Sequence, residues 1–326
     1  MTLTELRYLV ALDKERHFGR AAERAFVSQP TLSVAVKKLE AELGVVLFER
    51  NRGEARVTPI GRRIIDQAYR VLAEVRTLEL LAEQGRDELK GPLRLGVIYT
   101  VGPYLLPNLI PKLRQTAPNM PLVIEENFTR VLGQQLRGNE LDAIVVALPF
   151  SQPGTVTWPL YDEPFVVVMP HGHPWAERLE IAPNDLAGEE LLLLGPGHCF
   201  RDQVLAACPD CREPDAGTQP RAGSSLETIR HMVTSGLGIT VLPQSSIEDP
   251  NDDQTLLATR PFAGEAPSRR IALVWRKSFP RPRAIQALRQ AILECELNGV
   301  ALLTEQQART EDGTLVALPE TVIGDW

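Results

Sequence analysis

Three of the four cysteines in this chain of 326 residues lie close together, at Cys199, Cys208 and Cys211. Four cysteines are too few to hold a fold of this length together by disulfides. A thiol can instead act as a nucleophile. Its thiolate attacks peroxide, and the sulfenic acid that forms condenses with a second thiol to give a disulfide. The clustering of these cysteines therefore indicates redox chemistry.

Cys199 lies where a loop is expected to become a helix. The glycines and proline of residues 195–197 follow an apolar strand, and the residues after them predict a helix that runs toward Cys208. The N-terminus of a helix stabilises a thiolate, and His198 and Arg201 can add to that effect. Residues nine apart on a helix are separated by about 13–14 Å along its axis, whereas a disulfide requires Cα atoms within about 7 Å. A bond between Cys199 and Cys208 would require this helix to unwind, so oxidation would be both the signal and the conformational change.

Other interpretations of the cysteines stay open. They could be small hydrophobic residues at chance spacing. They could ligate a metal together with His198, although the nine-residue gap is unusual for such a site. Residues 208–211, Cys-Pro-Asp-Cys, could form a dithiol of their own, although no thioredoxin-like βαβ pattern surrounds them. A switch between Cys199 and Cys208 is favoured, and no bound metal or cofactor is expected.

The charge of the chain is divided between two parts. The formal net charge is −7, which by itself argues against a nucleic-acid partner. Residues 1–65, however, carry 12 Lys and Arg against 8 Asp and Glu, a charge of +4, and the remaining residues carry −11. A basic head on an acidic body is expected when one module binds a polyanion and the other does not.

Length and composition are those of a globular protein with two or three domains. Hydrophobic residues make up 44% and charged residues 24% of the chain, which excludes disordered and fibrous classes. The N-terminal residues show no signal-peptide pattern, and the longest apolar runs are far too short to span a membrane. We therefore expect a cytoplasmic protein with no membrane partner.

The basic head predicts a helix-turn-helix. Two short amphipathic helices, the second beginning near Phe18, precede a third helix over residues 29–42, for which Ser28 is the expected N-cap. Leu32, Val36 and Leu39 are expected to face a core, so the polar face can enter a major groove. The residues expected to lie toward base edges and the DNA backbone are Ser28, Gln29, Pro30, Thr31, Ser33 and Lys37.

A hairpin wing and a long helix are expected after the helix-turn-helix. Arg50, Arg52 and Arg56 lie in or beside the Gly-containing segment 51–57, and the first two are expected to contact phosphates or the minor groove. Thr58 then caps a helix whose apolar residues recur at spacings of four and three, as in a helix that dimerises. These apolar residues are Ile64, Ala68, Val71, Val75, Leu78 and Ala82.

Residues 92–300 alternate short strands and helices, which predicts an α/β body with largely parallel sheets and a site at the carboxyl ends of strands. Ser224 and Glu227 predict a capping box at the start of one helix. Enzyme motifs are absent from the sequence. Residues 236–238, Gly-Leu-Gly, lack the third glycine of a dinucleotide loop, and no P-loop, zinc-protease or serine-hydrolase motif occurs. We expect a protein that is not an enzyme in the turnover sense.

The head resembles the DNA-binding domain of LysR-type transcriptional regulators. The resemblance runs without gaps over sixty residues and includes Leu6, Phe18, Ala21-Ala22, Ser28-Gln29-Pro30-Thr31-Leu32-Ser33, Lys38-Leu39-Glu40, Leu47-Phe48-Glu49-Arg50 and Thr58-Pro59-x-Gly61. It implies a winged helix-turn-helix at residues 1–58, a dimerising linker helix at 59–90, a two-lobed α/β regulatory domain like a periplasmic binding protein at 91–300, and a tail at 301–326. It also implies a homotetramer, a dimer of dimers, with double-stranded promoter DNA and RNA polymerase as partners.

The body resembles the peroxide-sensing members of that family. The residues concerned are Gly197-His198-Cys199-x-Arg201-Asp202-Gln203, Cys208 and the run Thr100-Val101-Gly102-Pro103-Tyr104-Leu105-Leu106-Pro107. The resemblance implies that Cys199 is the peroxidatic cysteine and Cys208 the resolving cysteine. The side chains that it places around hydrogen peroxide and the thiolate are those of Thr100, Thr129, His198, Arg201 and Asp202. Two departures are Glu125, where some members have His, and the extra Cys211, which allows a bond of Cys211 with Cys199 or Cys208.

The resemblance therefore implies a transcription activator of the oxidative-stress response. It would be switched by a reversible Cys199–Cys208 disulfide and restored by a dithiol reductant such as glutaredoxin or thioredoxin. Two rival hypotheses remain. One is a regulator that binds a small anion or metabolite between the lobes, near Thr100, Ser224 and Ser225. The other is a thiol peroxidase, which the surroundings of Cys199 would also suit.

Overall fold

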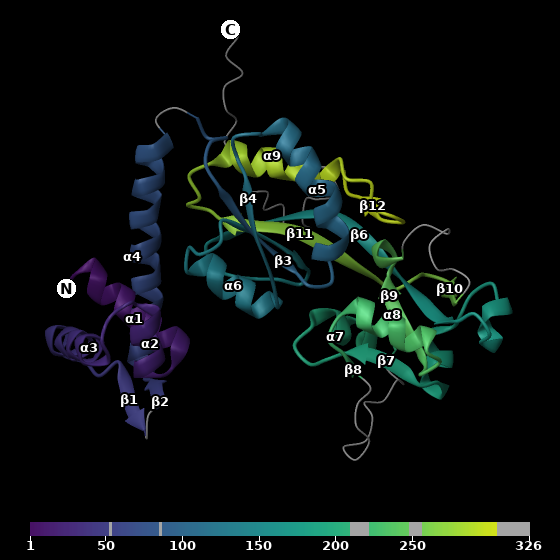
Figure 1. Ribbon diagram of the computed structural model, residues 1–326, viewed down its shortest axis with the longest axis horizontal. Coiled ribbons are helices and arrows are strands. Elements are labelled where there is room, and N and C mark those ends of the chain that lie inside the picture. The colour runs from purple at the N-terminus through teal and green to yellow at the C-terminus, as the bar shows by residue number, and fades with distance from the viewer. Residues whose placement is uncertain (52–53, 85–86, 209–221, 248–255, 305–326) are drawn as a thin grey trace, which may run out of the picture. The chain divides into compact units, whose positions relative to one another are not determined.

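The computed structural model describes residues 1–51, 54–84, 87–208, 222–247 and 256–304 (Figure 1). The chain divides into two compact units. The first contains Met1–Arg86 and the segment Gln134–Leu141, and the second contains Asp87–Gly133 and Asp142–Trp326. No helix among the described residues is both long and apolar enough to cross a membrane.

The first unit begins with a winged helix-turn-helix, as predicted. Its elements are α1 (Leu3–Glu15), α2 (Phe18–Arg24), α3 (Gln29–Leu43) and the antiparallel hairpin of β1 (Phe48–Asn51) and β2 (Glu54–Val57). Ser28 caps α3, because its hydroxyl accepts a hydrogen bond from the backbone N–H of Thr31 at 3.3 Å. The ring of His17 caps α2 in the same way, a role that the sequence did not suggest.

Apolar side chains from all three helices and the hairpin form one core in the head. The predicted inward residues of α3, Leu32, Val36 and Leu39, are all buried. Each fully buried side chain of this size stabilises the fold by about 1.5–3 kcal/mol. The polar face of α3 is therefore left outside the core, where a ligand can reach it.

Helix α4 (Pro59–Gln84) follows the hairpin. The hydroxyl of Thr58 accepts a hydrogen bond from the N–H of Gly61 at 2.9 Å, which confirms the predicted cap. The side chains of α4 that belong to the core of the head are those of Ile65, Ala68 and Tyr69. The predicted apolar stripe is therefore only partly buried within the chain: Leu78, for example, is 67% exposed.

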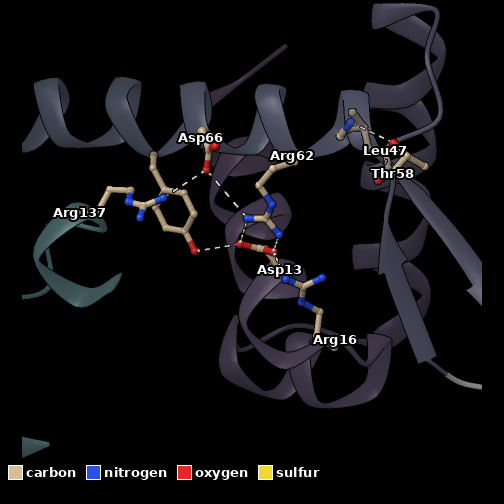
Figure 2. Close-up of polar contacts among 9 residues, drawn as sticks. Asp13, Arg16, Leu47, Thr58, Arg62, Asp66 and Arg137 are labelled. Atoms are coloured by element: carbon tan, nitrogen blue, oxygen red, sulfur yellow. Dashed lines mark hydrogen bonds and ion pairs between the residues drawn. The ribbon is translucent and has the colours of Figure 1, made fainter. Parts of the chain in front are cut away.

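A charged network ties α4 to α1 (Figure 2). Asp13 of α1 is buried and accepts two hydrogen bonds from the guanidinium of Arg62, at 2.7 and 3.1 Å. The hydroxyl of Tyr69 donates to the same carboxylate at 3.3 Å, and Arg16 lies 3.0 Å from it. Paired hydrogen bonds between a guanidinium and a carboxylate restrict the orientation of both partners. The start of α4 is thereby fixed against the head.

The second unit is built on one twisted sheet that serves two lobes (Figure 1). The first lobe has the strand order β4-β3-β5-β11-β6 and the second lobe has the order β6-β9-β7-β8. The strands are β3 (Leu93–Ile98), β4 (Leu122–Asn127), β5 (Ala143–Ala147), β6 (Thr155–Pro170), β7 (Leu191–Leu194), β8 (Ala222–Gly223), β9 (Ile239–Pro243) and β11 (Ser268–Arg276). Strand β6 belongs to both lobes, since its first part pairs with β11 and its last part with β9.

The prediction of largely parallel sheets was wrong. Strands β3, β4 and β5 are parallel to one another, and so are β7, β8 and β9, but β6 and β11 run antiparallel to their neighbours. β10 (Leu257–Pro261) and β12 (Ala301–Leu302) also pair antiparallel with β6. Antiparallel pairs need no helical crossover, so long strands can carry the chain between the lobes. Alternation along the sequence does not reveal these directions.

Helices cover both lobes. Helices α5 (Gly102–Thr116) and α9 (Pro282–Leu293) pack together on the first lobe, where α6 (Thr129–Arg137) also lies, and α7 (Cys199–Ala207) and α8 (Leu226–Thr234) lie on the second lobe (Figure 1). The expected helix at Ser224 and Glu227 is α8, but its cap is Ser225, whose hydroxyl accepts from Thr228 N at 3.1 Å. Short 3-10 turns at Pro174–Glu177, Pro183–Gly188 and Gln244–Ser246 complete the described connections.

Replacing Asp13 by Asn should destabilise the first unit. The amide keeps the volume but removes the charge that Arg62 and Tyr69 bind, and hydrogen bonds to charged groups each contribute about 1.5–3 kcal/mol. We expect the free energy of unfolding to fall by about 2 kcal/mol, measured by urea denaturation. The exposed Glu23, changed to Gln, is the matched control. Equal stability of the two variants would contradict the role given to Asp13.

Candidate functional site

Three residues that the sequence singled out lie at the carboxyl ends of parallel strands. Thr100 follows β3, Thr129 follows β4 at the first position of α6, and Cys199 follows β7 at the first position of α7. This is the edge of an α/β sheet at which ligand sites are expected. The structure brings all three side chains to one small cavity.

Cys199 is a free, half-buried thiol. The hydroxyl of Thr129 donates to its Sγ atom over 3.6 Å. A sulfur with a hydroxyl donor at the start of a helix has two sources of stabilisation for negative charge. The site is therefore suited to hold a thiolate.

The cavity beside Cys199 is very small. The space open to the centre of a water-sized molecule is about 10 Å³, which is room for about one such molecule. Its walls are the residues Ile98, Tyr99, Thr100, Asn127, Phe128, Thr129, Gly197, His198 and Cys199. A molecule of the size of water fits this space.

The Thr100 hydroxyl is oriented by a buried charge. The guanidinium of Arg269 donates to the Thr100 hydroxyl oxygen at 2.7 Å and to the Thr100 carbonyl at 2.9 Å. The same guanidinium pairs with Glu163 at 2.6 Å, and neither side chain of that pair is exposed. Because the hydroxyl oxygen of Thr100 accepts from Arg269, its own hydrogen is directed elsewhere. It can donate to a molecule in the cavity.

Aromatic rings close one side of the cavity. The rings of Phe128 and His198 lie 4.8 Å apart, and Tyr99 lies 5.4 Å from Phe128 and 5.9 Å from His198, measured between ring centroids. Burial lowers the pKa of His198 below its usual value, so its imidazole is neutral near pH 7. The expected contribution of His198 to the thiolate is then that of a neutral ring which excludes water, not that of a cation.

Arg201 and Asp202 do not line the cavity. Arg201 is buried, and its guanidinium donates to the carbonyl of Leu194, at the end of β7, at 2.9 Å. Asp202 is exposed on the first turn of α7. Helical geometry explains the difference, because residues two and three positions after Cys199 point to other faces of the helix.

Cys208 lies at the opposite end of α7. It is 2% exposed and belongs to the core of the second lobe. It is disulfide-bonded in this structure, but not to Cys199 or Cys295, both of which are free thiols. Cys211, the remaining cysteine of the chain, lies outside the described residues. No Cys199–Cys208 bond is therefore present, and the intact helix keeps the two cysteines about 13–14 Å apart along its axis.

The structure bears on two alternatives for this region. Among the described residues, no three His, Cys, Asp or Glu side chains are grouped so that they could hold a metal ion. For the metabolite hypothesis, Ser225 is occupied as the cap of α8, and neither it nor Ser224 lines the cavity at Thr100.

The candidate DNA surface lies on α3. Ser28, Gln29, Pro30, Thr31 and Lys37 are exposed, and Ser33 is half-buried. Lys38 is different from its neighbour Lys37, because it donates to Glu5 of α1 at 2.8 Å. In the wing, Arg56 on β2 is exposed. Arg52 and the side chain of Arg50 lie outside the described residues.

Several residues of the site were not found from the sequence. Asn127 and Phe128 directly precede Thr129 at the end of β4, so their place at a strand terminus was an available signal. Arg269 and Glu163 gave no such signal. They lie on β11 and β6, far from Thr100 in the sequence, and only the pairing of these strands brings them beside it.

Both parts of the chain match families of known proteins. Residues 3–62 match the model of the bacterial regulatory helix-turn-helix protein, lysR family, and residues 86–295 match the LysR substrate binding domain. The DNA-binding transcriptional dual regulator OxyR of Escherichia coli K12 is 42% identical over 292 residues, which cover 90% of this chain and 95% of that protein.

Solved structures are similar over almost the whole chain. Full-length OxyR of Pseudomonas aeruginosa, with a cysteine-to-aspartate substitution, is 53% identical, with a TM-score of 0.71 and coverage of 91% of this chain and 99% of that one. A cysteine-to-serine mutant of OxyR from Corynebacterium glutamicum, solved with H2O2 bound, is 35% identical, with a TM-score of 0.59 and coverage of 90% and 91%.

Replacing Thr129 by Val should slow the reaction of Cys199 with hydrogen peroxide. The variant keeps the shape of the side chain but removes the hydroxyl donor to Sγ. We expect a rate constant lower by about tenfold, the effect of roughly 1.4 kcal/mol, measured by stopped-flow loss of the free thiol. The exposed Thr116 on α5, changed to Val, should react like the wild type. An unaltered rate for Thr129→Val would contradict a part for this hydroxyl.

Proposed function

This chain belongs to the LysR family of transcriptional regulators and to its OxyR group, and we propose that it senses hydrogen peroxide through Cys199 and converts the oxidation into a change of DNA binding. One observation carries this proposal: a half-buried free thiol opens onto a cavity for one water-sized molecule, with threonine hydroxyls beside it. The similarity to relatives named as OxyR, one of them solved with H2O2, supports it.

The first chemical step joins Cys199 to one oxygen of peroxide. The Cys199 thiolate attacks that oxygen, the O–O bond breaks, and the second oxygen leaves as hydroxide, which takes up a proton to become water. The sulfur is oxidised to a sulfenic acid and the peroxide is reduced. The hydroxyl of Thr129 stabilises the sulfur charge before the attack, and the hydroxyl of Thr100, oriented by Arg269, donates to the peroxide in the cavity.

The second step uses Cys208. Its thiolate attacks the sulfur of the sulfenic acid, an S–S bond forms, the S–O bond breaks, and hydroxide leaves and is protonated to water. This requires Cys208 as a free thiol, so the disulfide that Cys208 carries here must be reduced first. A cytosolic dithiol such as glutaredoxin or thioredoxin would do this, and would also return the oxidised sensor to its starting state.

Formation of the Cys199–Cys208 bond has to unwind α7. Phe200 and Val204 of this helix are buried in the core of the second lobe, and Arg201 is bonded to Leu194. Removing one such apolar side chain from the core costs about 1.5–3 kcal/mol. The oxidation must offset that cost, so reduction of the disulfide favours return of the helix. The disulfide favours the unwound state and the buried contacts of α7 favour the helix. The switch should therefore reverse when the disulfide is reduced.

The remaining parts of the chain have matching roles in this proposal. Residues 1–58 bind promoter DNA, 59–90 dimerise, 91–300 sense peroxide, and 301–326 form a tail. The exposed Leu78 and the half-buried Ile64, Val71 and Val75 on α4 support a dimer through this helix, and two such dimers would form the tetramer. A regulator of this kind acts in the cytoplasm, where it meets both DNA and RNA polymerase, and activates transcription.

Substitution of the two cysteines should separate the two steps. With Cys199→Ser, one equivalent of peroxide should leave DNA binding unchanged. With Cys208→Ser, Cys199 should still be oxidised but stop at a sulfenic acid that dimedone traps. Peptide mapping by mass spectrometry after reduction and re-oxidation checks both outcomes, and the buried Cys295, changed to Ala, is the control.

Other results of that experiment would support the rival functions. A response to inducer that survives Cys199→Ser would favour a metabolite effector. Sustained turnover of peroxide with a dithiol donor would favour a thiol peroxidase, whereas a single stoichiometric oxidation is expected for a sensor. A disulfide between Cys199 and Cys211 would show that Cys211, and not Cys208, is the resolving residue.

Substitutions in the head should distinguish base contacts from phosphate contacts. Arg56→Ala should weaken binding to all DNA sequences and lower the slope of log affinity against log salt by about 0.9 for each phosphate that the protein no longer neutralises. Gln29→Ala should instead relax sequence preference, at a cost of about 1–3 kcal/mol. Fluorescence anisotropy across a salt series measures both, with the exposed Lys277→Ala of the body as control. A salt slope unaffected by Arg56→Ala would count against the wing assignment.

A further inference from the structure

Helix α3 exposes an apolar side chain at the middle of its outer face. Val34 is 65% exposed, although it lies two positions from each of the buried side chains Leu32 and Val36. Because successive residues turn by about 100° around an α-helix, a residue two positions away points to roughly the opposite side. Val34 therefore faces away from the core of the head.

Burial does not account for a valine at this position. An exposed side chain contributes little to the core, and valine forms helices less well than alanine, because its branched Cβ restricts the side-chain rotamers. Single apolar residues are common on protein surfaces. Val34 differs from these in its place, since it lies on the second turn of α3. The N-terminal turns of this helix are the ones that meet base edges in a helix-turn-helix.

The side chains around Val34 suit a surface that meets DNA. Pro30 is four residues earlier in α3 and therefore lies on the same face, one turn nearer the start of the helix. Lys37 is three residues later and exposed, as a contact with a phosphate requires. Lys38, by contrast, donates to Glu5 of α1 at 2.8 Å. Pro30 and Val34 thus form an apolar patch with a lysine beside it.

Only one base offers an apolar group in the major groove. Guanine, cytosine and adenine present hydrogen-bond donors and acceptors there, whereas thymine also presents the methyl group on its C5 atom. The side chain of valine has neither a donor nor an acceptor. Against a polar base edge it would remove water from groups that it cannot bind, which costs free energy. Against a thymine it buries one methyl group on another, which is favourable.

We propose that Val34 reads the C5-methyl group of a thymine in each half-site of the promoter, with Pro30 extending the same apolar patch. The inference rests on DNA binding by α3 within the proposed function, and it is independent of the peroxide chemistry at Cys199. The cap of Ser28 and the buried Leu32 hold this part of α3 in place. Val34 adds a preference for thymine to the contacts that the polar side chains of α3 make.

The test compares thymine with deoxyuridine, which lacks only the C5-methyl group. The full chain, kept reduced, first selects its preferred sites from random-sequence duplexes. Each selected thymine is then replaced singly by deoxyuridine, and the affinity is measured by fluorescence anisotropy. At one thymine of a half-site, the wild type should bind the deoxyuridine duplex about fourfold more weakly, which is the effect of losing one buried methyl group.

The variant for this test is Val34→Ala. At that position it should bind the thymine and deoxyuridine duplexes equally, because the methyl group of the base has lost its partner. Val34→Thr keeps one methyl group on a branched Cβ and should retain part of the discrimination. The matched control is Val46→Ala, since Val46 is 58% exposed and follows the C-terminal end of α3. It should discriminate like the wild type.

The outcomes separate failure of this inference from failure of the proposed function. Circular dichroism checks that Val34→Ala is folded, and its exposed position predicts a melting temperature no lower than that of the wild type. A wild type that selects no sequence overturns DNA recognition in the proposed function, and the inference with it. A wild type that selects a sequence but is indifferent to deoxyuridine at every thymine overturns the inference alone. Discrimination by Val34→Ala as strong as that of the wild type does the same.

Discussion

A buried guanidinium, that of Arg269, is the constraint on which the site depends. A charge without access to water is tolerated only when it is paired and hydrogen-bonded. Arg269 meets this requirement with Glu163 on the neighbouring strand and with two oxygens of Thr100. Glu163 in turn accepts from the backbone of Ser245. Strands β6 and β11 and the loop after β3 are thereby held in one arrangement, and that arrangement forms a wall of the cavity.

The chemistry of the cavity follows from its size and from the direction of its hydroxyls. The cavity has room for about one water-sized molecule. Within it, selectivity for peroxide over water comes from a nucleophile, since only peroxide has an O–O bond to break. The aromatic wall of Phe128, His198 and Tyr99 closes one side of the cavity, and a neutral His198 places no positive charge beside the thiol.

The contacts of α7 and the ion pairs of segment 134–141 differ in strength. The contacts that keep α7 helical include buried apolar side chains, so they are individually strong. The ion pairs between segment 134–141 and the head are partly exposed, and each such pair contributes at most about 1 kcal/mol. The buried contacts of α7 are therefore the larger part of what the oxidation of Cys199 has to overcome.

The amino-acid sequence alone was sufficient for the local features. The N-cap Ser28, the core residues of α3, the start of α4 at Thr58 and the position of Cys199 at the first turn of α7 all depend on residues close together in the chain. Such features follow from capping, periodicity and backbone geometry, which act over a few residues. The separation of charge between residues 1–65 and the rest is likewise a property of composition.

Tertiary structure decided what depends on residues far apart in the chain. Strand direction in β6 and β11, the pairing of Arg269 with Thr100, and the place of Arg201 against Leu194 could not be read from periodicity. The same holds for the contact of Arg137 with Asp66. These contacts form only when strands and helices pack, and packing selects side-chain directions that spacing along the chain leaves open. The sequence supplied a thiol at the start of a helix. The fold supplied the cavity beside it.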